Sequence, residues 1–235
     1  MSFFEDGKTV LNHLDDYYHQ SIEKKKPVIR QLSIDELHGK LDLAFHLKHG
    51  DLSGDRLDAF LRDYLDNTTR LHHPGYFAHQ VGVSHPTGAL GSLIDGFTNN
   101  AMAIFEMGPA AAAIEFFMIN VLLGKIGWVP MPAEIEKRLT YCHGSGVLTH
   151  GGSLANMTAL LAARNHLDNT IREGGNPSDL VILAPESSHY SIAKAAGIIG
   201  IGENNVIGLE TDPAGRVRIS KLDHAFQTSV DNGKR

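Results

Sequence analysis

The sequence contains very little cysteine and no surplus of positive charge. Cys142 is the single cysteine among 235 residues, so no disulfide can form within the chain, which is typical of a reducing compartment. The formal net charge of −6 argues against a broad surface for nucleic acid or for anionic lipids. The first residues, Met1-Ser-Phe-Phe-Glu-Asp6, turn acidic at once and show no signal peptide. We therefore expect a cytoplasmic protein that binds neither nucleic acid nor membrane.

A long uninterrupted apolar run is also missing. The most apolar stretch, residues 110–126, is interrupted by Glu115, Asn120 and Lys125, and is shorter than most membrane spans. Pro109 precedes it and is suited to the first position of a helix. Because the stretch is apolar nearly all round, it predicts a buried helix at the centre of the fold.

Three amphipathic helices are expected before any strand. Residues 7–26 carry apolar side chains at helical spacing, and the run ends before Pro27. Ser33 and Glu36 form a capping-box pattern that opens a second helix, and Ser53 leads into a third. We expect residues 1–90 to form a helical arm with a substrate-side loop, and residues 91–235 to form the first part of a large domain.

The second part of the chain alternates strand and helix patterns. Residues 180–184 and 205–210 are short apolar runs suited to buried strands, with helical segments before, between and after them. Such alternation predicts βαβ units. The expected class is α/β, with a mainly parallel sheet flanked by helices.

The chain is organised around residues 144–164. A short apolar segment leads to a turn at Gly151 and Gly152, and Ser153 opens a strong helix. Free N–H groups and the positive end of the helix dipole favour an anion such as phosphate there. The alternative is that Ser153 merely caps a packed helix. The pattern is neither a P-loop nor a dinucleotide fingerprint.

A histidine-rich loop is expected at residues 72–80, where Pro74 and Gly75 interrupt regular structure. His72, His73 and His79 lie close together in sequence, but no Cys, Asp or Glu completes a recognised metal-ligand spacing. We expect no metal site, and interpret the loop as a wall of a substrate pocket.

Three stretches together resemble the pyridoxal-phosphate-dependent group II amino-acid decarboxylases, the glutamate and aromatic-amino-acid decarboxylase family. They are His73-Pro-Gly-Tyr-Phe77, Gly146-Val-Leu-Thr-His-Gly-Gly-Ser-Leu-Ala-Asn156 and Ser188-His-Tyr-Ser-Ile-Ala-Lys-Ala-Ala196, and the similarity runs from about residue 52 to residue 226. The resemblance implies a fold-type-I PLP-dependent transferase-like fold, of which the chain is the N-terminal portion. It also implies a homodimer, because the N-terminal helices of this family wrap the partner subunit.

The resemblance assigns roles to particular residues. Gly152 and Ser153 would hold the phosphate of pyridoxal 5'-phosphate, and His189 would stack on its pyridine ring as a catalytic residue. Thr149 and Asn156, which flank the turn, are further cofactor-binding candidates. For His189 the alternative is a helix-capping or core histidine.

Two groups of the family's active site have no counterpart here. In the family the Schiff-base lysine and the aspartate that pairs with the ring nitrogen lie downstream of the stacking histidine, and the sequence ends at Arg235 before either. Lys194 matches no family lysine. We therefore expect the 235 residues alone to be inactive as a decarboxylase. Another PLP reaction on the same scaffold (aminotransferase or lyase), or a non-catalytic remnant that binds cofactor or dimerises, remains open.

The expected reaction is decarboxylation of an L-amino acid to the amine and carbon dioxide. Phe77 and His79 are candidate substrate-binding residues. His79 and Gln80 are polar where the aromatic branch is largely apolar, and residues 100–109 resemble a run of the glutamate and cysteine-sulfinate branch. The sequence therefore favours an acidic or polar amino acid.

Overall fold

The computed structural model describes residues 2–50, 52–77 and 79–235. Ala78, in the predicted loop, and Met1 and Asp51, in the predicted arm, lie outside the described residues. The chain forms two compact units, one up to Asn99 and one from Asn100 to Arg235. The roles assigned to residues 1–90 and 91–235 stay predictions.

The first unit is built from helices. They are α1 (Phe3–Ile22), α2 (Ile34–Leu41), α3 (Leu43–His49), α4 (Gly54–Asp66) and α5 (Pro86–Thr98). The capping box at Ser33 is confirmed, because its hydroxyl accepts the Glu36 N–H while the Glu36 carboxylate accepts the Ser33 N–H. Ser53 is the N-cap residue of α4, as expected. Helix α3 was not predicted, and it begins where Asp42 adopts a left-handed conformation.

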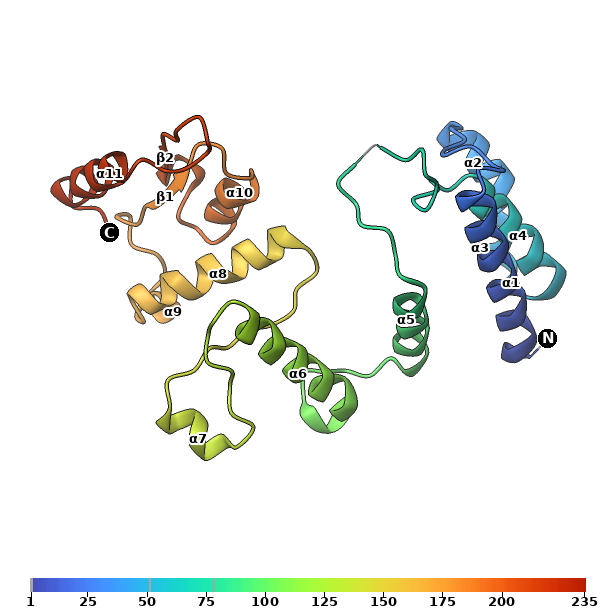
Figure 1. Ribbon diagram of the computed structural model, residues 1–235, viewed down its shortest axis with the longest axis horizontal. Coiled ribbons are helices and arrows are strands. Elements are labelled where there is room, and N and C mark those ends of the chain that lie inside the picture. The colour runs from blue at the N-terminus through green and yellow to red at the C-terminus, as the bar shows by residue number, and fades with distance from the viewer. Residues whose placement is uncertain (1, 51, 78) are drawn as a thin grey trace. The chain divides into compact units, whose positions relative to one another are not determined.

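Helices α1 and α4 pack side by side (Figure 1), and a buried arginine joins them. Arg70, only 3% exposed, donates hydrogen bonds to the Tyr17 carbonyl and to the Ser21 hydroxyl, each at 3.0 Å. Nearer the start of the helices, His13 Nε2 lies 2.7 Å from Asp58 Oδ1. Polar side chains with fixed partners therefore hold this helix pair in register.

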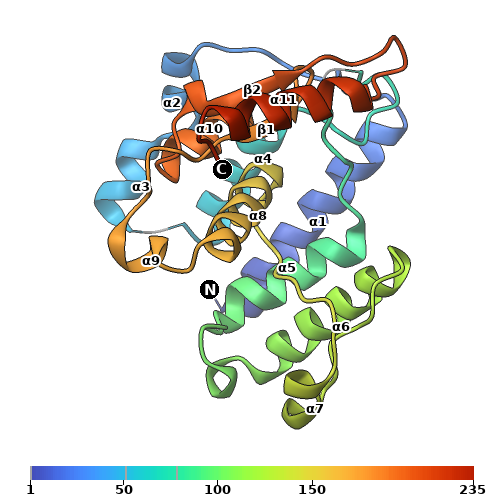
Figure 2. The ribbon, with the colours of Figure 1, turned by 90° about the vertical axis from the view of Figure 1, so that its left-hand side faces the viewer.

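The second unit contains a parallel strand pair flanked by helices. Its elements are η1 (Phe105–Met107), α6 (Pro109–Lys125), α7 (Ile135–Thr140), α8 (Gly152–Leu167), α9 (Ile171–Gly174), β1 (Ile182–Pro185), α10 (Ser191–Ile198), η2 (Glu203–Asn205), β2 (Val206–Leu209) and α11 (Ile219–Asp231). Strands β1 and β2 pair in parallel from Ile182 with Val206 to Pro185 with Leu209. Figure 2 shows α10 and α11 beside this pair, and both helices contact it. The predicted strands and the α/β class are confirmed.

Helix α6 is formed as predicted, but its expected burial is wrong within this chain. Ile119 and Leu123 are buried, whereas Ile114 and Phe117 are 65% and 64% exposed. One side of the helix is covered by the segment at residues 144–148, and the described residues do not cover the other. No helix in the described ranges combines the length and apolar character that crossing a bilayer requires.

The backbone of Arg235 pairs with the segment that leads into β1. Its N–H donates to the Asp179 carbonyl at 2.8 Å, and its carbonyl accepts the Val181 N–H at 2.9 Å. In a parallel ladder, a residue bonds through its N–H and its carbonyl to the two residues that flank the one it faces. The two Arg235 bonds follow this pattern. Ion pairs from the Arg235 guanidinium to Asp168 and Asp179 anchor this pairing.

Candidate functional site

Residues 144–148, which precede the turn at Gly151 and Gly152, lie closely against α6. A Cβ atom at Gly144 would come within 2.7 Å of Leu123 Cδ2, so glycine permits the close approach seen here. The Gly144 N–H donates to the Val129 carbonyl at 2.8 Å, and the Leu148 N–H donates to Glu115 Oε1 at 3.0 Å. The chain therefore enters the turn from a position fixed by hydrogen bonds at both ends of the segment.

The turn itself depends on a glycine conformation. Gly151 has φ 85° and ψ 165°, a region that is essentially restricted to glycine. Thr149 closes the turn, because its carbonyl accepts the Gly151 N–H at 3.0 Å and its hydroxyl donates to the Gly151 carbonyl at 3.3 Å. Thr149 thus shapes the turn from within.

The first turn of α8 presents free donors. Gly151 is the N-cap residue and makes no side-chain cap, so the alternative in which Ser153 caps the helix is wrong. Within the described ranges, the N–H groups of Gly152, Ser153 and Leu154 and the Ser153 hydroxyl have no hydrogen-bond acceptor. A Cβ atom built at Gly151 or Gly152 would meet nothing within 4 Å. Four donors without an acceptor in the described part of the chain therefore gather at the positive end of a helix dipole.

His189 is tied to the same end of α8 by two intervening polar side chains. Asn156 Nδ2 donates to Ser191 Oγ at 2.9 Å, and Ser191 Oγ lies 2.8 Å from His189 Nδ1. The Ser191 N–H also donates to Nδ1 at 3.2 Å. The capping alternative for His189 is therefore seen in part, whereas the core alternative is wrong because the residue is exposed. The Tyr190 ring lies 4.2 Å from the imidazole, centroid to centroid, at 36°.

The second unit thus brings together five predicted site residues through α8 and α10: Thr149, Gly152, Ser153, Asn156 and His189. Their roles toward a cofactor stay predictions. Ser191 received no role from the sequence, although it lies two residues after His189 in the motif at 188–196. The structure reveals the link, because Ser191 is the first residue of α10, is 2% exposed and bonds to Asn156 of α8.

The two predicted substrate residues lie in the first unit. Phe77 is 90% exposed, and the His79 N–H donates to the Tyr76 hydroxyl at 3.3 Å. Their roles are also predictions. His72 Nε2 lies 3.0 Å from the Ser84 carbonyl oxygen, and His73 Nδ1 accepts the Gly75 N–H at 2.9 Å. Across the ranges described, no three metal-ligating side chains lie close enough to hold an ion.

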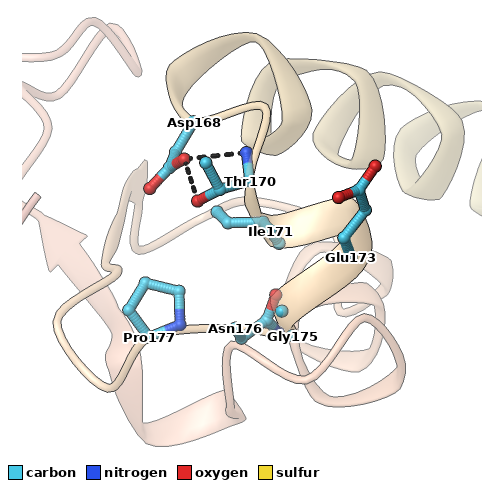
Figure 3. Close-up of a pocket in the computed structure, with 8 residues that line it drawn as sticks. Asp168, Thr170, Ile171, Glu173, Gly175, Asn176 and Pro177 are labelled. Atoms are coloured by element: carbon cyan, nitrogen blue, oxygen red, sulfur yellow. Dashed lines mark hydrogen bonds between the residues drawn. The ribbon is translucent and has the colours of Figure 1, made fainter.

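A separate hollow of about 570 Å³ opens where α8 ends and α9 begins. Figure 3 shows its lining, in which Asp168 accepts two hydrogen bonds from Thr170, one from its N–H and one from its hydroxyl. These bonds, with the nearby Arg235 guanidinium, hold the pKa of Asp168 below its ordinary value. None of the predicted site residues lines this hollow, so we assign it no part in the site.

The residues present fit the phosphate and ring of pyridoxal phosphate. Uncapped N–H groups and a free hydroxyl at a helix N-terminus suit a phosphate dianion. An exposed imidazole, held by its Nδ1 atom, leaves a ring face and its second nitrogen for a planar ligand.

Comparisons with known proteins agree with this fit. Residues 53–234, more than half of the chain, match the sequence model of the pyridoxal-dependent decarboxylase conserved domain. The chain is 26% identical to the aromatic-L-amino-acid decarboxylase of Bacillus atrophaeus over 92% of the chain, and 24% identical to an acidic amino acid decarboxylase of Xenopus tropicalis over 98%. It covers 42% of each relative's length. The crystal structure of mouse CSAD superposes with a TM-score of 0.79 at 20% identity, covering 100% of this chain and 47% of that one. The chain therefore belongs to the pyridoxal-dependent decarboxylase family.

Proposed function

We propose that the second unit supplies the phosphate-binding turn and the ring-stacking histidine of a PLP-dependent L-amino-acid decarboxylase. The observation that carries the proposal is the hydrogen-bonded link from Asn156 through Ser191 to His189. It ties helix α8, whose first turn carries the free donors, to an exposed imidazole through contacts of 2.9 and 2.8 Å. A phosphate and a planar ring belonging to one ligand require these two features in one place.

Each residue then has a stated task. The N–H groups of Gly152 and Ser153, together with the Ser153 hydroxyl, hold the phosphate through charge-assisted hydrogen bonds. Thr149 keeps the turn in shape, and His189 holds the plane of the ring. When bound, the cofactor supplies an electron sink for the charge left at Cα as carbon dioxide departs. No residue of this chain is assigned as the Schiff-base lysine.

A binding experiment tests the phosphate site without any chemistry at lysine. Pyridoxine 5'-phosphate lacks the aldehyde and cannot react with surface lysines, so its affinity for the 235-residue chain reports on the pocket alone. We expect it to bind more tightly than pyridoxine, and we expect Ser153→Ala to weaken its binding about tenfold, the effect of one charge-assisted hydrogen bond. Ser145→Ala, on the segment before the turn, is the matched control. Equal affinity for the two ligands would refute the proposal.

The substrate we favour is an acidic or polar L-amino acid, bound with the help of His79 and Phe77. The polar character of His79 and Gln80 supports this choice. In the whole enzyme, His79→Ala should lower the preference for L-glutamate over L-phenylalanine. An unchanged preference would remove His79 from the substrate site.

The same proposal includes a cytoplasmic location and a homodimer. A cytoplasmic location is supported by the single cysteine, because a chain with no disulfide within it is typical of a reducing compartment. A homodimer is supported by the exposed apolar side chains of α6, among them Ile114 and Phe117, because soluble monomers rarely expose large apolar patches. Sedimentation equilibrium over a range of concentrations tests the dimer, and a monomer at every concentration would exclude it.

A further inference from the structure

The link between α8 and α10 also determines where the His189 proton lies. Ser191 is the first residue of α10 and is 2% exposed. Its hydroxyl lies between Asn156 Nδ2 at 2.9 Å and His189 Nδ1 at 2.8 Å. The amide, the hydroxyl and the imidazole each have a known number of protons and lone pairs. The direction of each hydrogen bond follows from these numbers.

The proton count favours one arrangement. The Asn156 amide nitrogen can only donate, so Ser191 Oγ accepts on that side and keeps its own proton for His189. The Ser191 backbone N–H, 3.2 Å from the same ring nitrogen, is a second donor. Two donors that converge on Nδ1 require its lone pair. The neutral imidazole must therefore carry its proton on Nε2.

We infer that Ser191 and Asn156 are positioning residues that hold His189 in the Nε2–H tautomer and fix the orientation of its ring. The inference rests on the proposed function for its consequence, which is that His189 would offer an Nε2–H donor to a bound cofactor or substrate. The opposite tautomer would place the Nδ1 proton against the Ser191 N–H. It would also leave the buried Ser191 hydroxyl proton without an acceptor among the described residues.

The Tyr190 ring adds to this arrangement. It lies against the imidazole at 4.2 Å between centroids, so one face of the His189 ring is already in contact with an aromatic side chain. A pyridine ring that stacks on His189 would take the opposite face. Ser191, itself held by Asn156, binds the imidazole at its edge and leaves that face accessible.

Nitrogen-15 NMR measures the tautomer directly in the 235-residue chain. Long-range correlations between the ring protons and nitrogens distinguish the two neutral forms, and loss of signals in His189→Gln assigns His189 among the 14 histidines. We expect an unprotonated Nδ1 and a protonated Nε2 in the parent chain. A parent in which Nδ1 carries the proton would overturn the inference.

Substitutions at Ser191 and at Asn156 should both move the tautomer away from the Nε2–H form, to different extents. Ser191→Ala removes one of the two donors, so the ratio of the Nε2–H to the Nδ1–H form should fall about threefold to tenfold, and Ser191→Thr should restore it. Asn156→Asp replaces a donor with an acceptor and draws the Ser191 hydroxyl proton away, so the Nδ1–H form should become the major one. Asn169→Asp, which adds the same charge at an exposed position, should leave the ratio unchanged.

The outcomes separate this inference from the proposed function. If Ser191→Ala fails to fold, as judged by circular dichroism, the Asn156→Asp result decides alone. An unchanged tautomer in Asn156→Asp overturns the inference even if pyridoxine 5'-phosphate binds as expected. The expected tautomer shifts support it even if that ligand fails to bind, because the NMR measurement uses no ligand.

Discussion

Substituting Gly151 tests whether the turn at the start of α8 needs a glycine backbone. Its φ of 85° and ψ of 165° lie in a region where any side chain costs about 1–3 kcal/mol. A new Cβ atom would meet no neighbour within 4 Å, so the penalty comes from the backbone alone. Gly151→Ala should lower the free energy of unfolding of the second unit by that amount.

Gly152→Ala is the matched control, one residue further along. Gly152 is the first residue of α8, its φ is not positive, and a Cβ atom there also meets nothing within 4 Å. Alanine in a helix is more stable than glycine by up to about 1 kcal/mol, so this variant should be neutral or slightly stabilised. The two variants should therefore differ by about 1–4 kcal/mol.

Urea unfolding followed by tryptophan fluorescence suits the comparison, because Trp128 is the only tryptophan and lies in the second unit. Gly151→Ala should shift the midpoint to lower urea without changing the slope. Equal midpoints for Gly151→Ala and Gly152→Ala would refute the argument from backbone conformation. If Gly152→Ala lost pyridoxine 5'-phosphate binding while its stability stayed unchanged, Gly152 would act in phosphate binding and not in the stability of the turn.

Three further predictions concern the helix pair, its pH response and the activity. Arg70→Met removes a buried guanidinium and its bond to Ser21, and should destabilise the first unit by about 2–3 kcal/mol; a change below about 0.5 kcal/mol by circular dichroism in urea would contradict this. The hydrogen bond from His13 holds the pKa of Asp58 below its ordinary value, so the stability this pair contributes is complete above about pH 3.9 and is lost as pH falls through the lower folded-state pKa. The stability difference between the parent and Asp58→Asn should accordingly narrow below about pH 4, and a constant difference from pH 5 to pH 3 would argue against it. Finally, the 235-residue chain with pyridoxal phosphate should release no carbon dioxide from L-glutamate or L-phenylalanine, and turnover that Lys194→Ala abolishes would show that this chain carries its own lysine.

Local signals predicted the elements well where a short stretch decides the structure. The Ser33 capping box, the start of α4 after Ser53 and the two strands each depend on a few neighbouring residues. Helix α3 was missed because its start depends on the left-handed conformation of Asp42, which the residue type permits but does not require.

Features that depend on distant parts of the chain could not be predicted in the same way. The predicted burial of α6 was wrong because apolar composition shows only that a helix surface favours contact with other apolar groups. It does not show whether other residues of this chain provide that contact. The glycine turn and the candidate His189 were named from the sequence, but the hydrogen bonds that tie His189 to α8 were not. Asn156 and Ser191 are 35 residues apart, and they meet only because α10 packs against α8.

The backbone pairing of Arg235 has a practical consequence for protein engineering. Because its N–H and carbonyl already engage Asp179 and Val181, residues fused directly after it would enter alongside β1 in the parallel direction. An apolar fusion sequence there would extend the ladder and invite association between chains through a new edge. An affinity tag at this end should therefore be separated from Arg235 by a glycine- and serine-rich spacer.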